Sequence, residues 1–164
     1  MKTEFIIMNF QIWTDGGFSF NNKIGSWSFL LFHDNKDQRI EQYGLVDHHK
    51  QTSQIAEMMA IVKALQFVSD VLCEDDLVKA KAVDITITTD SMYCVNSMND
   101  WMHKWQKAGW PADKQNLDLW MQVFALKLRF KSVNAVWVKG HSGIELNERV
   151  DYLNQQALIE KGLR

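Results

Sequence analysis

The chain has few of the residues that mark secreted, fibrous or membrane-bound proteins. Its 164 residues include one proline and two cysteines, and no low-complexity segment or Gly/Ser/Pro-rich linker divides it. Cys73 and Cys94 are isolated thiols, which we interpret as small buried hydrophobic residues rather than a disulfide or a metal pair. Near the amino terminus only four apolar residues follow one another, at 5–8, far fewer than a signal peptide or membrane span needs. We therefore expect one domain over residues 1–164, located in the cytoplasm and without a membrane segment.

Hydrophobic patterning indicates an α/β protein. Apolar or alternating runs at 5–14, 25–33 and 38–46, separated by polar turns at 21–23 and 34–37, predict an antiparallel meander. Thr52 or Ser53 should cap a helix whose buried face carries Ile55, Met58, Met59, Val62, Leu65 and Gln66. The remaining pattern predicts strands at 83–89 and 132–138, and helices within 91–107, at 116–129 and at 145–161. A meander followed by βα units gives a mixed five-stranded sheet with helices packed on it.

Two threonine-aspartate pairs end two of the predicted strands. Thr14-Asp15 ends the run at 10–14, and Thr89-Asp90 ends the run at 85–89. Because ligands bind outside the carboxyl ends of parallel strands, the two aspartates can meet in one cleft. Two carboxylates repel unless a cation lies between them, and Mg²⁺ is held by such carboxylates together with phosphate oxygens. The pattern therefore indicates phosphate chemistry.

Two further segments make this interpretation specific. Residues 51–60 (Gln-Thr-Ser-Gln-Ile-Ala-Glu-Met-Met-Ala) open a helix that carries Glu57, and residues 138–143 (Val-Lys-Gly-His-Ser-Gly) lead to Asp151. Together with the aspartate pairs, this set and its order resemble ribonuclease H of the type I family, over about residues 10–157. The resemblance implies an RNase H-like fold, with a mixed sheet of strand order 3-2-1-4-5 and helices on both faces. It also implies an endonuclease that cuts the RNA strand of RNA/DNA hybrids.

Each acidic residue in this set also has an ordinary structural explanation. Asp15 and Asp90 could be turn formers, Glu57 a helix acid favoured by the dipole, and Asp151 a solvated helix residue. Their joint occurrence in order favours a functional site, because all four fall where the family has its metal ligands. The resemblance implies two Mg²⁺ ions, or Mn²⁺ in their place, with Asp15 bridging both, Glu57 and Asp90 on one and Asp151 on the other. Products would carry a 5′-phosphate and a 3′-hydroxyl.

The histidines differ in their setting. His141 lies between Gly140 and Gly143 in a loop, and the resemblance implies that it moves a proton or helps product leave. His48 and His49 have no comparable setting, and we interpret them as solvated turn residues.

The net charge of −2 provides no general attraction for a polyanion, so a nucleic-acid site must be local. Residues 101–110 resemble the family's basic protrusion, where aromatic faces lie beside a cation, although one tryptophan or more should belong to the core. The glycine-rich segment at 16–20 is expected to be a short turn facing RNA 2′-hydroxyls. The substrate-binding residues that the resemblance implies are Gly16, Gly17, Thr52, Ser53, Gln54, Trp101, Lys104, Trp105, Lys107, Lys139, Asn147 and Glu148. The expected partner is an RNA/DNA hybrid, bound by a monomer.

Two other functions share part of this pattern. An integrase or resolvase on the same fold would keep the aspartates, but the helix with Glu57, the loop with His141 and the Trp/Lys segment argue against it. A hybrid-binding module without catalysis is expected to have a broken carboxylate set, and here all four are present.

Overall fold

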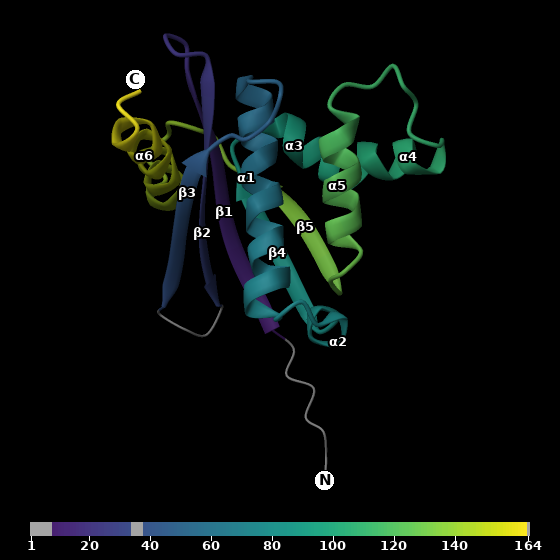
Figure 1. Ribbon diagram of the computed structural model, residues 1–164. Helices are drawn as coiled ribbons and strands as arrows, with labels where there is room; N and C mark the ends of the chain where they lie inside the picture. Colours follow the sequence, from purple (N-terminus) through teal and green to yellow (C-terminus); the bar gives the residue numbers. More distant parts are fainter. Residues whose placement is uncertain (1–7, 34–37, 164) are drawn as a thin grey trace.

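A five-stranded mixed sheet forms the centre of the computed structural model, which describes residues 8–33 and 38–163 (Figure 1). Its strands are β1 (Met8–Ser19), β2 (Ile24–His33), β3 (Arg39–Leu45), β4 (Val83–Thr89) and β5 (Ser132–Trp137). They lie in the order β3-β2-β1-β4-β5, with β1 antiparallel to β2 and parallel to β4. The predicted strand order is confirmed. Residues 5–7 of the first expected strand and the expected turn at 34–37 lie outside the described residues.

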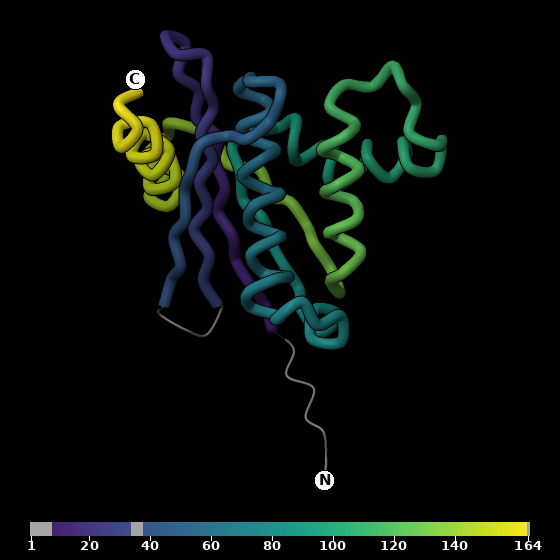
Figure 2. Tube along the Cα trace, viewed as in Figure 1, coloured from purple at the N-terminus to yellow at the C-terminus, as the bar shows by residue number. Residues whose placement is uncertain are grey.

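The helices follow the predicted order along the chain. The long ones are α1 (Ser53–Phe67), α5 (Leu117–Lys127) and α6 (Glu145–Glu160), and α2 (Leu77–Ala80) is a single short turn. A π-helical turn, Val68–Leu72, extends α1. The segment expected to hold one or two short helices is a continuous run of α3 (Met92–Asn96), a π-helical turn (Ser97–Trp101) and α4 (Met102–Lys107). This run leads away from the sheet, and α4 projects sideways beyond α5 (Figure 2).

Helices cover both faces of the sheet, as expected. Successive strand residues point to opposite faces, and two neighbouring glycines show which helix lies on each. A Cβ at Gly16 would lie 2.3 Å from the backbone nitrogen of Glu57 in α1, whereas a Cβ at Gly17 would lie 3.1 Å from the Cβ of Asn154 in α6. The two glycines therefore allow α1 and α6 to pack closely against β1 from opposite sides.

The main core lies between the sheet and α1. Thr52 caps this helix, since its hydroxyl accepts a hydrogen bond from the Ile55 amide at 3.1 Å. The apolar residues of the predicted face are buried, as is the row behind it, Ile61, Ala64 and Val68. Gln66, which was also expected on that face, is only half-buried. Most of the α1 surface is buried, because α5 packs beside α1 while the sheet covers another face (Figure 1). Cys73 and Cys94 are buried free thiols, as expected.

The structure corrects the prediction of a turn at residues 16–20. The parallel ladder between β1 and β4 ends at Trp13 opposite Thr88, but β1 continues to Ser19 in antiparallel pairing with β2. Because β2 still supplies hydrogen-bond partners, Gly16 and Gly17 lie inside a strand and only residues 20–23 turn. No helix of the described chain is long and apolar enough to cross a membrane.

Candidate active site

Three carboxylates meet where the parallel strands end. Asp15 lies on β1 just past the last parallel pair, Asp90 directly follows β4, and Glu57 projects from the first turns of α1. One oxygen from each lies within 4.8 Å of the others. The prediction that the two aspartates meet is confirmed, and Glu57 joins them, as the resemblance implied.

The cluster is strongly disfavoured in its fully ionised form. Burial, followed by repulsion from Asp90 and Asp151, raises the pKa of Asp15 from 3.8 to about 8. Burial and the charges of Asp15 and Asp90 raise the pKa of Glu57 well above its usual value. Among the described residues, Glu57 Oε2 is buried and has no hydrogen-bond partner. A buried oxygen without a donor, beside two further carboxylates, fits a divalent cation with hard oxygen ligands.

Three residues fix the position of Asp90. A Cβ at Gly140 would lie 2.7 Å from Asp90 Oδ2, so only glycine lets the loop after β5 approach the carboxylate. Asn147, 3% exposed, places its Nδ2 3.4 Å from the same oxygen. Trp137 Nε1 donates to the Asp90 backbone oxygen at 3.2 Å. The sequence analysis missed the role of Trp137. The only sequence feature that could have indicated it is an aromatic residue at the end of a predicted strand, just before the Lys-Gly-His motif.

Asp151 lies near the cluster but outside its tight group. Its charge contributes to the raised pKa of Asp15, although it is not one of the three residues whose oxygens lie within 4.8 Å. Buried hydrogen bonds hold α6 against the sheet: Ser26 Oγ donates to Asn154 Oδ1 at 3.0 Å, and Ser28 Oγ donates to the Val150 carbonyl at 2.7 Å. These contacts fix the helix that carries Asp151. Metal ligation by Asp151 stays a prediction.

The loop with His141 is compact and exposed. Ser142 Oγ donates to the Lys139 carbonyl at 2.6 Å, and His141 adopts a left-handed backbone conformation with φ of 53°. Such a conformation is uncommon and costs energy in a residue other than glycine. His141 is exposed, and it directly follows Gly140, whose backbone comes close to the Asp90 carboxylate.

Several of the expected substrate-binding residues lie in two regions of the surface. Thr52, Ser53 and Gln54 line a groove of about 650 Å³ between the start of α1 and residues 112–116. The second region is the Trp/Lys segment, where the rings of Trp101 and Trp105 lie 6.2 Å apart. Trp105 packs against the core whereas Trp101 is exposed, which agrees with the expectation that one tryptophan or more is structural.

The charges of the Trp/Lys segment are partly neutralised. Lys104 Nζ lies 3.1 Å from Asp100 Oδ2, and this exposed pair would compete with phosphate for the ammonium group. Lys107 and Glu148 are exposed, as is Lys139. None of these positions is yet tested as a substrate contact, so each stays a prediction.

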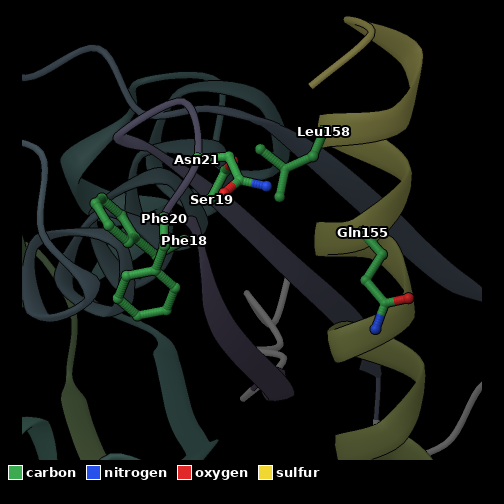
Figure 3. A pocket seen from close by; sticks show the side chains of 6 residues that line it. All are labelled: Phe18, Ser19, Phe20, Asn21, Gln155 and Leu158. Carbon is green, nitrogen blue, oxygen red and sulfur yellow. The ribbon is translucent and has the colours of Figure 1, made fainter. Parts of the chain in front are cut away.

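A separate hollow of about 480 Å³ lies between the end of the β1–β2 hairpin and α6 (Figure 3). Its lining includes Phe18, Phe20 and Leu158, and the Phe20 ring is 83% exposed. The lining contains neither a carboxylate nor a histidine, so this hollow does not contribute ionisable groups to the cluster.

The interpretation of His48 and His49 as solvated turn residues is wrong for His48. The His48 side chain is only 9% exposed, and its Nε2 lies 2.6 Å from Asp118 Oδ2 in α5. The interpretation failed because the partner is 70 residues away in the sequence and becomes a neighbour only when α5 packs beside α1.

A sheet of this order, with helices on both faces and acidic residues at the carboxyl ends of its parallel strands, is the arrangement expected of an RNase H-like fold. The model of the RNase H family matches residues 8–159. The chain therefore belongs to the ribonuclease H family and is a ribonuclease enzyme.

Individual relatives agree with this assignment. The Ribonuclease H of Phenylobacterium zucineum is 34% identical over 153 residues, which cover 91% of this chain and 90% of the relative. Among solved structures, LC9-RNase H1 has a TM-score of 0.75 at 20% identity, covering 94% of this chain and 74% of its own. LC11-RNase H1, solved in complex with an RNA/DNA hybrid, has a TM-score of 0.69 at 19% identity. The match covers 93% of this chain and 98% of the LC11-RNase H1 chain. At these identities the two structures show the shared fold.

Proposed function

We propose that the chain is an endonuclease that hydrolyses the RNA strand of RNA/DNA hybrids at Asp15, Glu57 and Asp90. The observation that carries the proposal is the group of three carboxylate oxygens within 4.8 Å of one another, with Glu57 Oε2 buried and unpartnered among the described residues. Such a group is suited to holding divalent cations against a phosphate. We assign it Mg²⁺, with two ions in the complete site and Asp151 as the fourth ligand.

The chain's own contribution is a rigid set of oxygen donors. Asp15 comes from a strand, Glu57 from a helix and Asp90 from a strand end, and the position of Asp90 is fixed by Gly140, Asn147 and Trp137. Ligands held by packed elements lose little freedom when they bind, so the site is organised before substrate arrives. Asp15, Glu57, Asp90 and Asp151 would hold the divalent ions, which would supply an activated water and stabilise the departing 3′ oxygen, so that the products carry 5′-phosphate and 3′-hydroxyl ends.

His141 supports the reaction from the loop beside Asp90. Its exposed imidazole can accept a proton near the cluster and release it to solvent, and Lys139 in the same loop offers a cation to a phosphate. Neither group belongs to the carboxylate cluster itself, so we assign His141 to proton movement and product release, and Lys139 to phosphate binding.

The hybrid is the substrate that the surface around the cluster supports. The homologous fold of LC11-RNase H1 binds an RNA/DNA hybrid. In this chain Thr52 to Gln54 line a groove with residues 112–116, and Trp101 is exposed at the end of the turn that leads into α4. We assign the DNA strand to these two regions and the selection of RNA to its 2′-hydroxyls in the wide minor groove, read near Gly16, Gly17 and Glu148.

The test is cleavage of end-labelled RNA/DNA hybrid, duplex RNA and duplex DNA, each with millimolar Mg²⁺ and with EDTA. We expect Mg²⁺-dependent cleavage of the RNA strand of the hybrid alone, with fragments that carry 5′-phosphate groups. Asp15→Asn, a nearly isosteric variant, serves as the inactive control. Cleavage of duplex DNA at a rate equal to that of the hybrid would refute the proposed substrate, and 3′-phosphate products would refute the proposed chemistry.

A further inference from the structure

A second group of metal-ligand side chains lies outside the carboxylate cluster. His48 and His49 belong to the loop between β3 and α1, and Asp118 lies in the first turn of α5. One ligand atom from each residue lies within 4.8 Å of the other two. The group therefore joins two segments that are distant in sequence, across the place where α5 packs against α1.

The His48 ring is held in one orientation from both of its nitrogens. Nδ1 accepts a hydrogen bond from the Lys50 amide at 3.0 Å, and Nε2 lies 2.6 Å from Asp118 Oδ2. With Nδ1 as an acceptor, the proton of the neutral ring lies on Nε2 and is donated to the Asp118 carboxylate. Nε2 and Asp118 Oδ2 therefore face each other, and an ion bound between them takes the place of this proton.

The loop that carries the two histidines is fixed by hydrogen bonds from Gln51. Gln51 Nε2 donates to the carbonyls of Val46 at 2.9 Å and of His48 at 3.0 Å, and Gln51 Oε1 accepts from the Gly25 amide at 2.8 Å. The histidine pair is thus anchored to the sheet rather than carried on a loose turn. Preorganised ligands of this kind lose little conformational entropy on binding an ion.

His49 and Asp118 complete the group. The His49 ring stacks on His48, with ring centroids 4.2 Å apart and an interplanar angle of 28°. Burial raises the pKa of Asp118, but its hydrogen bond and attraction to His48, with attraction to His49, lower it overall. The Asp118 side chain is 55% exposed, so it can move without disturbing the core.

We propose that His48, His49 and Asp118 form a second metal site, which takes a borderline transition-metal ion such as Zn²⁺ and ties the β3–α1 loop to α5. Two imidazole nitrogens and one carboxylate oxygen are ligands that Zn²⁺ prefers, whereas Mg²⁺ prefers oxygen alone. Water fills the fourth position. Ligand atoms about 2 Å from a tetrahedral ion lie roughly 3.3 Å apart, so Asp118 must withdraw from His48 by less than about 1 Å.

This site is independent of the proposed nuclease function, and its test does not depend on cleavage. The full chain in saturating Mg²⁺ is titrated with Zn²⁺ by calorimetry, and Co²⁺ is used as a spectroscopic probe of ligand number. We expect one Zn²⁺ per chain beyond the carboxylate cluster, together with a higher melting temperature. We also expect the intense visible absorption of Co²⁺ in a site of low coordination number.

Matched variants assign the ion to its ligands. His49→Gln and Asp118→Asn should each weaken Zn²⁺ binding at least about tenfold, since even the partners of metal ligands contribute that much. His49 is exposed, so its variant should melt like the parent in EDTA. Asp113→Asn removes an exposed acid near the start of α5 and should retain the parental affinity.

One further variant separates the two sites. Asp15→Asn weakens the carboxylate cluster and should leave this Zn²⁺ affinity unchanged. If Asp15→Asn abolishes Zn²⁺ binding while His49→Gln and Asp118→Asn retain it, the ion belongs to the carboxylates and the proposal is wrong. Absence of Zn²⁺ binding to the parent chain in saturating Mg²⁺ overturns it equally.

Discussion

Replacing Asp15 by asparagine should abolish cleavage yet stabilise the metal-free protein. Burial and the neighbouring acids raise the Asp15 pKa from 3.8 to about 8, so its ionised form is disfavoured by the fold. Each pKa unit corresponds to roughly 1.4 kcal/mol, so the free energy of unfolding can rise by at most about 4 kcal/mol at neutral pH when this carboxyl is replaced. The asparagine Oδ1 can still accept from the Gly16 amide, but this neutral acceptor bonds more weakly than a carboxylate, and the neighbouring acids relax. The net gain should therefore be about 1 to 2 kcal/mol, or roughly 2 to 8 °C in melting temperature.

The gain should depend on pH in a defined direction. In the unfolded chain the pKa of Asp15 is 3.8, so the proton is released near pH 3.8. In the folded, metal-free protein the pKa is about 8, so the proton is retained up to about pH 8. Between these values the folded state binds more protons, so the parent's free energy of unfolding should fall as pH rises. Asp15→Asn removes this part of the slope. Part of the decline should remain, because the pKa of Glu57 is raised in the same direction.

Thermal melts of parent and variant in EDTA, from about pH 4 to pH 9, measure both effects. Asp113→Asn, an exposed acid outside the cluster, should behave like the parent. Millimolar Mg²⁺ should then stabilise the parent more than Asp15→Asn, because the parent binds the ion more tightly. The reasoning is refuted if Asp15→Asn melts several degrees below the parent in EDTA and gains equally from Mg²⁺, since Asp15 would then be a structural residue.

Three further variants test the surroundings of the cluster by steady-state kinetics. His141→Ala should slow turnover at saturating substrate by roughly ten- to a thousandfold, and a complete loss of activity would show that its role is larger than proton movement. Trp101→Ala combined with Lys104→Ala should raise KM more than it lowers kcat, because these groups grip ground state and transition state alike, and a pure kcat effect would contradict a binding role. Gly140→Ala should lower kcat by about a hundredfold, because the added Cβ would displace the Asp90 carboxylate, and parental activity would show that the contact is not needed.

The sequence by itself determined the elements and the ionisable groups of the site. Helical and alternating periodicities predicted every strand and long helix in order, because burial of one face is a local property of the pattern. Asp15 and Asp90 could be placed in one cleft because parallel strands end at a common edge. The resemblance to the family added Glu57, which single-helix reasoning left open to an ordinary structural explanation.

Only the tertiary structure decided which residues support and shape the site. It extended β1 beyond Asp15, placed Gly140 against Asp90 and buried Asn154 between α6 and the sheet. It also paired His48 with Asp118 across 70 residues of sequence. None of these contacts has a local signal, because each depends on how whole elements pack. A glycine, an asparagine or a histidine pair looks the same in the sequence whether its partner is solvent or a side chain from a distant helix.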